Sequence, residues 1–366
     1  MSINLLLNLQ LGLVLWSGVG EQSPTPQPRY YDTRERVAAT MTFTWAETCH
    51  IRIPLERIRA HNAEMMAYIH ALAQSTKTPI ESFNDMLSKL IIDENIASMI
   101  FELSNYYTIE RTPQRTRIRT RRQAIDLHRA KVSEPLWEVE SYLQGNLVIS
   151  VHRDLSNGQV TAVYLAQCEE ELVGWGSPFG DAQPEWMVLH AGISPFRLYG
   201  HKPEDWRLVT VSPEEWVFEL PRKPEQEPNE QEDESAQNNQ VRPLRLYAPS
   251  VRFHLDRRYQ DALSRLEIRY ADGTTYIWRT LRYKRIENVW FPAEVEMSAK
   301  HPSQEAVSKM VLVTAQRTKA PLKLEIPEKT PVYDFRHLGQ QMWVHWGEYK
   351  PTEWDESLLK PPNRSK

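Results

Sequence analysis

The strongest structural signal in this 366-residue chain is Leu263-Ser-Arg-Leu-Glu-Ile-Arg-Tyr-Ala-Asp-Gly273. Apolar and charged residues alternate through its second half, which is typical of a β-strand with one buried and one solvated face. Asp272-Gly273 then favours a tight hairpin turn. Further strand patterns follow at 275–283, 289–297 and 309–315. The C-terminal third therefore predicts a β-meander, in which consecutive strands pair antiparallel.

One face of this meander is expected to be apolar. Alternation places Leu266, Ile268 and Tyr270 on the same side of their strand, and the same rule assigns apolar residues of the next two strands to that side. A sheet with one apolar face must cover it. We therefore expect other elements of the chain to cover this face. We hypothesise that the residues assigned to it line an apolar cavity on that side of the sheet: Leu266, Ile268, Tyr270, Ile277, Leu281, Phe291 and Val295.

Two amphipathic helices are predicted before the meander, and they are the expected cover. The first runs over 54–74, with apolar residues along one stripe. The second runs over 79–91, where Thr78 is positioned to cap the helix and Pro79 suits its first turn. Both need a sheet, or each other, to bury their apolar stripes.

Four segments of the C-terminal half resemble a known family in their order. They are Val251-Arg-Phe-His-Leu-Asp256, the stretch 263–273, Tyr283-Lys-Arg-Ile-Glu-Asn-Val-Trp-Phe-Pro292 and Pro331-Val-Tyr-Asp-Phe-Arg336. A strand leads to an Asp-Gly turn, a strand crosses back, and a Trp-Phe-Pro step opens the next strand. This order resembles the LolA/LolB-like superfamily of periplasmic lipoprotein carriers, of which this chain would be a divergent and longer member.

The resemblance implies an α+β fold, in which a strongly curved antiparallel β-sheet forms a half-open barrel whose concave side is covered by helices. It also implies an exported, non-catalytic carrier that binds an acyl chain or a lipid-modified protein and needs no cofactor. The alternative is a structural or protein-interaction module of the cell envelope, with a filled barrel and no small ligand. An enzyme of unrecognised type is a third hypothesis.

The first half and the middle of the chain carry more strand patterns. Asn157-Gly158 predicts a hairpin between two β-rich runs. Shorter strand-like runs follow, and the aromatic run Met342–Trp346 predicts a terminal strand or, alternatively, an interfacial membrane contact. The predicted strands of this part are 146–152, 159–167, 186–190, 207–211 and 216–220.

The sharpest charged feature is an alternating arginine run. Six arginines and no acidic residue lie between Arg111 and Arg122. As a strand, 115–121 puts Arg115, Arg117, Arg119 and Arg121 on one face. Like charges on one face repel, so this face is either solvated or in contact with anions. An anionic membrane surface or a partner's acidic patch would be such a contact.

Composition excludes several other classes of protein. The formal net charge is −4, which argues against a nucleic-acid partner. The sequence has no His-Glu-x-x-His zinc motif and no Gly-x-Ser-x-Gly nucleophile motif. His61, Glu64 and His70 lie on one predicted helix, where solvated or capping roles are favoured over metal binding. Cys49 and Cys168 could form a disulfide in an exported protein, or remain two separate buried thiols.

The ends of the chain and one internal segment suggest the domain boundaries. Residues 5–16 have the length of the apolar part of a secretory signal, although no basic residue precedes them. This predicts a periplasmic or secreted protein with a signal peptide at 1–20; the alternative is that the segment is an ordinary buried strand or helix. Glu, Pro, Gln and Asn dominate 222–243, which predicts a disordered insertion. The expected organisation is a linker and N-terminal segment at 21–53, one domain at 54–336 and a tail at 337–366.

Overall fold

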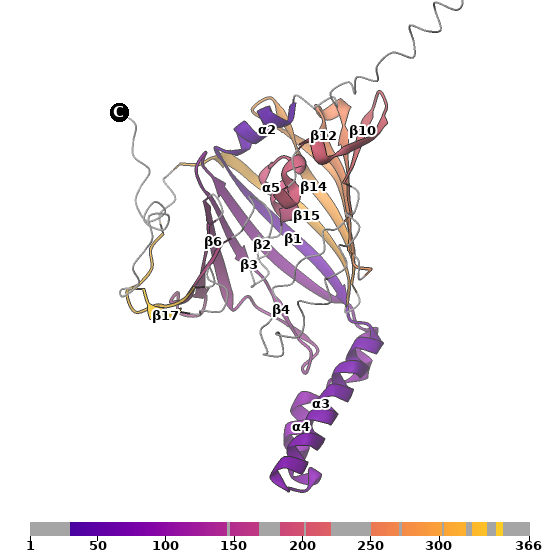
Figure 1. Cartoon of the computed structure of the whole chain (residues 1–366), viewed down its shortest axis with the longest axis vertical. Helices are drawn as coiled ribbons and strands as arrows, with labels where there is room; N and C mark the ends of the chain where they lie inside the picture. The colour runs from indigo at the N-terminus through magenta and orange to yellow at the C-terminus, as the bar shows by residue number, and fades with distance from the viewer. Residues whose placement is uncertain are drawn as a thin grey trace, which may run out of the picture.

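The structure is a computed structural model, and it describes residues 30–144, 147–167, 184–200, 203–220, 250–270, 273–301, 304–319, 324–334 and 342–346. These residues form one 15-stranded sheet and a separate two-stranded hairpin (Figure 1). Neighbouring strands of the sheet run antiparallel, except that β8 and β16 are parallel. The predicted antiparallel sheet is therefore confirmed, with one parallel pair that the sequence did not predict.

The elements have the following bounds. The strands of the sheet are β1 (Met41–Arg52), β2 (Phe101–Arg111), β3 (Thr116–Arg121), β6 (Trp137–Gln144), β7 (Leu147–Asp154), β8 (Val160–Gln167), β9 (Arg207–Val211), β10 (Glu215–Leu220), β11 (Ser250–Asp256), β12 (Ala262–Arg269), β13 (Thr275–Ile286), β14 (Val289–His301), β15 (Gln304–Arg317), β16 (Pro331–Asp334) and β17 (Met342–His345). The hairpin consists of β4 (Ala124–Asp126) and β5 (Lys131–Ser133). The α-helices are α2 (Tyr30–Ala38), α3 (Leu55–Thr76), α4 (Asn84–Leu90) and α5 (Pro184–Ala191). The 3₁₀ turns are η1 (Ile80–Phe83), η2 (Glu94–Ser98), η3 (Pro195–Gly200), η4 (Pro203–Asp205) and η6 (Arg257–Tyr259).

The sheet consists of two meanders joined side by side. One runs from β1 through β2, β3, β6 and β7 to β8, and the other runs from β9 to β15. They meet where β1 pairs with β15. β16 and β17 extend the first meander, so β17 and β9 are the two edges of the described sheet. Figure 1 shows the sheet bent into two wings that face each other, with α5 between them. We call this inner face the concave face.

The predicted strands of the C-terminal third are confirmed as β12 to β15, and the Asn157-Gly158 hairpin is confirmed between β7 and β8. Gly158 has φ +72°, a conformation that suits glycine in such a turn. β9 and β10 are confirmed as strands, and Met342–His345 forms β17, paired with β16. The strand predicted at 186–190 is wrong, because these residues belong to α5. A short apolar run suits either element, and Pro184 before it and Gly192 after it favour a helix.

The predicted first helix is confirmed as α3, but its expected position over the concave face is wrong. α3 packs against η1, α4 and η2, and Figure 1 shows it projecting away from the end of the sheet. The predicted second helix is split into η1 and α4, and Thr78 does not cap it. Asn62 of α3 holds the segment that follows α4 against the helix. Its Nδ2 donates to Ile92 O at 2.8 Å, and its Oδ1 accepts from Ile92 N at 2.9 Å. The apolar stripe of α3 is therefore covered largely by η1, α4 and η2, which form a helical hairpin with it.

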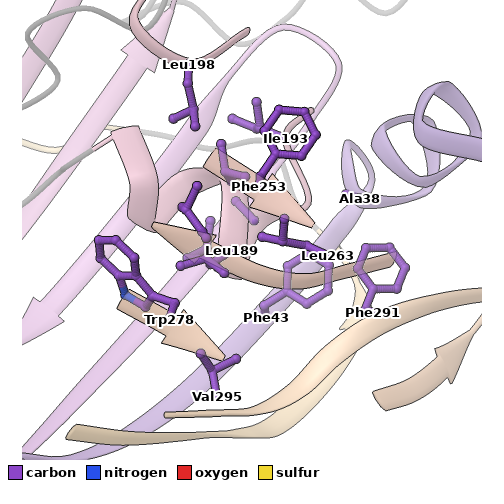
Figure 2. Packing of buried hydrophobic residues seen from close by; sticks show 14 of the residues in the cluster. Ala38, Phe43, Leu189, Ile193, Leu198, Phe253, Leu263, Trp278, Phe291 and Val295 are labelled. Carbon is purple, nitrogen blue, oxygen red and sulfur yellow. The ribbon is translucent and has the colours of Figure 1, made fainter. Parts of the chain in front are cut away.

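Buried apolar residues form three clusters. The main core lies on the concave face and joins both wings to α2, α5 and η3 (Figure 2). The root cluster joins the start of α3 to the adjoining strand ends and comprises Cys49, Ile58, Ile92, Ile96, Phe101, Leu103 and Ala306. The outer cluster comprises Tyr142, Ile149, Val151, Val163, Leu165, Leu324 and Val332.

The outer cluster lies on the opposite face of the sheet from the main core. Leu143 and Val148 face each other in the pairing of β6 with β7 and belong to the main core. Their neighbours Tyr142 and Ile149 also face each other but belong to the outer cluster. Because adjacent residues of a strand point to opposite faces, this wing is buried on both sides.

Several predictions lie outside the described residues. They are the signal peptide at 1–20, the disordered insertion at 222–243 and the position of Cys168. Cys49 is a buried free cysteine.

Candidate functional site

In the part of the chain that the structure describes, α5 followed by η3 lies over the concave face, and we call this segment the cover (184–200). α5 rests on β1 and β2. Two side chains of these strands bind the end of the helix: Trp45 Nε1 donates to His190 O at 3.2 Å, and Arg111 Nη1 donates to Ala191 O at 2.8 Å. A cation at a helix C-terminus also suits the helix dipole. Burial lowers the pKa of Arg111 to about 10, so the guanidinium remains charged at neutral pH.

Gly192 seats the cover against α2 and the sheet. It follows α5 directly and has φ +68°, the left-handed conformation in which glycine commonly ends helices. A Cβ at this position would lie 2.8 Å from Ala38 Cβ and 2.9 Å from Phe291 Cε1. Only glycine therefore allows this approach without movement of its neighbours.

Phe196 of η3 anchors the far end of the cover. Its ring lies edge-on to Phe218 and Phe253, with centroids at 4.9 and 5.0 Å. Trp206 packs edge-on against Phe196 and donates its indole N–H to Phe196 O at 3.0 Å. Such edge-to-face contacts add to the energy of apolar burial. The cover is thus held by the first meander at α5 and by the second at η3.

α2 closes the upper rim of the concave face, and Arg34 holds it there. The Arg34 guanidinium, only 1% exposed, donates to the backbone oxygens of Trp290 at 2.8 Å, Asp261 at 3.2 Å and Gln260 at 2.8 Å. Glu35 forms an ion pair with Arg197 of the cover at 2.8 Å. α2 therefore links the second meander to the cover.

Replacing Arg34 by alanine is expected to destabilise the protein by about 3 kcal/mol or more, because one buried and two part-buried carbonyl groups lose a charged donor. Arg34→Lys should recover less than half of this loss, since a single ammonium cannot match the planar fork. Arg36→Ala, two residues along the same helix on its exposed side, is the control and should change stability by less than about 0.5 kcal/mol. Urea unfolding measures all three. Equal losses of unfolding free energy for Arg34→Ala and Arg36→Ala would contradict the role of Arg34 in holding α2 to the second meander.

Most of the predicted cavity residues lie on the concave face. Leu266, Ile268 and Val295 are 0% exposed and Phe291 is 3% exposed, all within the main core, and Tyr270 packs against it. The register of β13 differs from the prediction by one residue. Trp278 pairs with Leu266 and faces the core, so Ile277 lies on the other face and Leu281 is 52% exposed. β13 has bulky residues on both faces, so alternation alone does not distinguish its two sides.

A polar group interrupts the apolar concave face on β1 and β2. Glu47, 8% exposed, accepts hydrogen bonds from Asn105 Nδ2 at 2.8 Å and from the Tyr107 hydroxyl at 2.5 Å. Burial raises the pKa of Tyr107, which keeps this hydroxyl protonated. Thr120 Oγ1, Trp278 Nε1 and Ser308 Oγ are among the buried polar atoms that have no hydrogen-bond partner in the described part of the chain.

The arginine run forms β3, with its side chains between acidic residues of the adjacent strands. Glu110 of β2 pairs with Arg117 at 2.5 Å and with Arg119 at 3.5 Å. Arg117 also pairs with Glu140 of β6 at 3.3 Å, and Arg121 with Glu138 at 2.6 Å. Arg115 is 7% exposed. Three of the four predicted anion contacts thus already have carboxylate partners.

The other candidate groups have structural surroundings. His61 Nε2 lies 3.1 Å from Leu90 O, and His70 is exposed. Burial raises the pKa of Cys49 to about 12, so this thiol is unreactive at neutral pH. Within the described ranges, no group of three or more His, Cys, Asp or Glu residues could hold a metal ion. The described helices include none that is long and apolar enough to cross a membrane.

The sequence reasoning missed the residues that seat the cover. Gly192 and Pro184 were readable as helix punctuation, and they could have identified α5. Arg34 and Phe196 carry no local signal, because their partners are far away in the chain.

No family model matches this chain, and no curated protein matches it. Three solved structures are similar to it. A DUF1329 family protein from Desulfovibrio piger has 6% identity and a TM-score of 0.38, with 79% of this chain and 91% of that chain covered. A candidate outer membrane lipoprotein-sorting protein domain from Vibrio parahaemolyticus has 8% identity and a TM-score of 0.37, with 79% and 91% covered. A LolA superfamily protein from Nitrosomonas europaea has 10% identity and a TM-score of 0.34, with 80% and 95% covered.

Two of these descriptions name lipoprotein sorting or the superfamily that the sequence resembles. TM-scores this low carry no conclusion about the family or activity of this chain. The curved, mainly antiparallel sheet that the resemblance implies is seen directly in the chain itself.

Proposed function

We propose that this protein is an exported, non-catalytic carrier that binds the acyl chain of a lipid or lipid-modified protein on the concave face. The cover would be displaced when the ligand enters. The observation that carries the proposal is the difference in size between the apolar face of the sheet and the segments that cover it. In the described part of the chain, a long apolar face contributed by two meanders is covered by the eight-residue α5 and the six-residue η3, with α2 at its rim.

Displacement of the cover is physically reasonable because much of its contact with the sheet is apolar. The sheet binds the end of α5 through Trp45 and Arg111, and α2 adds one ion pair through Glu35. Trp206 adds one hydrogen bond, from its indole N–H to Phe196 O. The aliphatic and aromatic contacts of the cover are apolar, and an acyl chain in the same place would replace them. Apolar burial is non-directional and depends mainly on area, so the exchange need not cost much free energy.

Native mass spectrometry tests this function on the full protein after incubation with vesicles of phosphatidylethanolamine and phosphatidylglycerol. We expect bound lipid on the wild type and a larger bound fraction on Phe196→Ala, which loosens the cover. Leu165→Ala is the matched control, because it opens the outer cluster by a similar large-to-small change. It should leave the bound fraction at the wild-type level.

The runner-up is an envelope interaction module with a filled interior and no small ligand. The complete burial of Leu266, Ile268 and Val295 favours it, because these side chains are already packed. In that case all three proteins would give only the ligand-free mass. An anionic membrane surface as a partner stays a prediction, and the ion pairs of β3 reduce the charge available for it.

A further inference from the structure

A separate hollow lies at the base of α3, where the helical hairpin joins the sheet. It has a volume of about 420 Å³ and lies between the first turns of α3, Ile92 and the β4–β5 hairpin. This volume is within the usual range of small-molecule sites, ~300–1,000 Å³. The residues around it are Ile53, Arg57, Ile58, His61, Ile92, Ile125, Asp126, Leu127 and His128.

The interior of the hollow is apolar. Five of its nine lining residues are isoleucine or leucine, and they belong to the root cluster or pack against it. Ile58 and Ile92 are buried at 1% and 6% exposure. The wall formed by Ile92 is firmly held, because the Asn62 amide bonds both backbone groups of that residue. This wall therefore does not depend on a ligand for its shape.

The rim is basic on the helix side. Arg57 is exposed, and no hydrogen bond or ion pair joins its guanidinium to any described residue. It stands in the first turn of a 22-residue helix, where the dipole favours anions. The guanidinium of Arg59, two residues along, is by contrast already in an ion pair with Glu94 at 3.0 Å.

One acidic residue also lines the hollow, but it is engaged in its own turn. Asp126 Oδ1 accepts from His128 N and Arg129 N, both at 3.1 Å. Its Oδ2 lies 3.6 Å from Arg129 Nε. His61 Nε2 is also engaged, because it lies 3.1 Å from Leu90 O. The groups left to meet a ligand at the rim are thus the Arg57 guanidinium and the His128 side chain.

We propose that this hollow binds an alkyl chain that ends in an anionic group, with the chain against the isoleucine and leucine floor and the anion at Arg57. A fatty acid carboxylate and an alkyl phosphate share this chemistry. The site is separate from the concave face and does not depend on the carrier function proposed above.

Isothermal titration calorimetry with dodecanoate and with dodecyl phosphate, each below its micelle concentration, tests the site on the full protein. We expect saturable binding of at least one of them, and the tighter one identifies the head group. Arg57→Gln should weaken binding about tenfold, in line with a charge-assisted hydrogen bond. Arg59→Gln is the matched control and should bind as the wild type does. Arg57 is exposed, so its variant should melt at the wild-type temperature.

A second variant tests the floor. Leu127→Asp places a carboxylate in the apolar floor of the chain site, on the short hairpin, and should abolish binding of both probes. Uncharged dodecanol should bind the wild type more weakly than the anions do. It should bind Arg57→Gln as tightly as it binds the wild type. Binding that is unchanged in both Arg57→Gln and Leu127→Asp would place the chain elsewhere and overturn the proposal, as would the absence of binding. Either result leaves the lipid experiment on the concave face unaffected.

Discussion

Val295→Asp is expected to abolish cooperative folding at neutral pH. Val295 is 0% exposed within the main core, and it pairs with Thr280 of β13 and Met310 of β15 in the middle of the sheet. An aspartate here would bury a carboxylate without a charged partner. The cost should exceed about 4 kcal/mol, which approaches the whole stability of a marginally stable domain, about 5 kcal/mol. Circular dichroism during urea unfolding would measure the loss.

The pH dependence of this variant gives a second readout. Burial raises the pKa of a carboxyl group above its unfolded value of about 3.9. The folded state then binds the proton more tightly than the unfolded state, so the variant regains stability relative to the wild type below about pH 4 and loses it as the pH rises through the raised pKa. Val313→Asp is the control, because Val313 of β15 is 54% exposed. If Val295→Asp instead folds and loses only bound lipid, the concave face opens to water.

Gly192→Ala is expected to cost far more than Gly158→Ala, although both glycines have positive φ. At Gly158 nothing lies within 4 Å of the added Cβ, so the cost is only that of the left-handed conformation, about 1–2 kcal/mol. At Gly192 the added carbon meets Ala38 and Phe291 below 3.0 Å. Overpacking should add about 1–3 kcal/mol. The difference between the unfolding free energies of the two variants, measured in urea, gives the cost of overpacking at Gly192.

Hydrogen exchange would show where the energy is lost. If Gly192 seats the cover, the amides of 184–200 should exchange faster in Gly192→Ala while those of β12 to β14 stay protected. Under the carrier proposal, this variant should also bind more lipid than the wild type. Equal costs for the two glycine variants would show that α2 and Phe291 move aside easily and that the cover is not tightly seated.

The sequence predicts the second meander well because its information is local. Alternation and the small sequence separation of successive strands together favour β12 to β15. Alternation fails in β13, where Trp278 on one face and Leu281 on the other are both apolar. It also fails to choose a face in β6, where Tyr142 and Leu143 are buried on opposite sides.

The candidate site was less predictable because its contacts are long-range. Glu110, Glu138 and Glu140 were visible in the sequence, yet only the pairing of β3 with β2 and β6 brings them to the arginines. The helix predicted as the cover was placed wrongly because an apolar stripe does not specify its partner. α3 satisfies its stripe with its own hairpin, and the much shorter α5 lies against the sheet instead.

The seam between β1 and β15 has a consequence for how the chain acquires its structure. Met41 pairs with Arg317 and Arg52 with Glu305, so partners across the seam are separated by most of the chain. Long-range pairing of this kind slows folding, because a large loop must close before any contact rewards it. During synthesis, β1 would wait with one edge unpaired until β15 emerges. We therefore expect slow folding, with each meander collapsing first and the seam closing last, and a nascent chain that relies on chaperones to protect that edge.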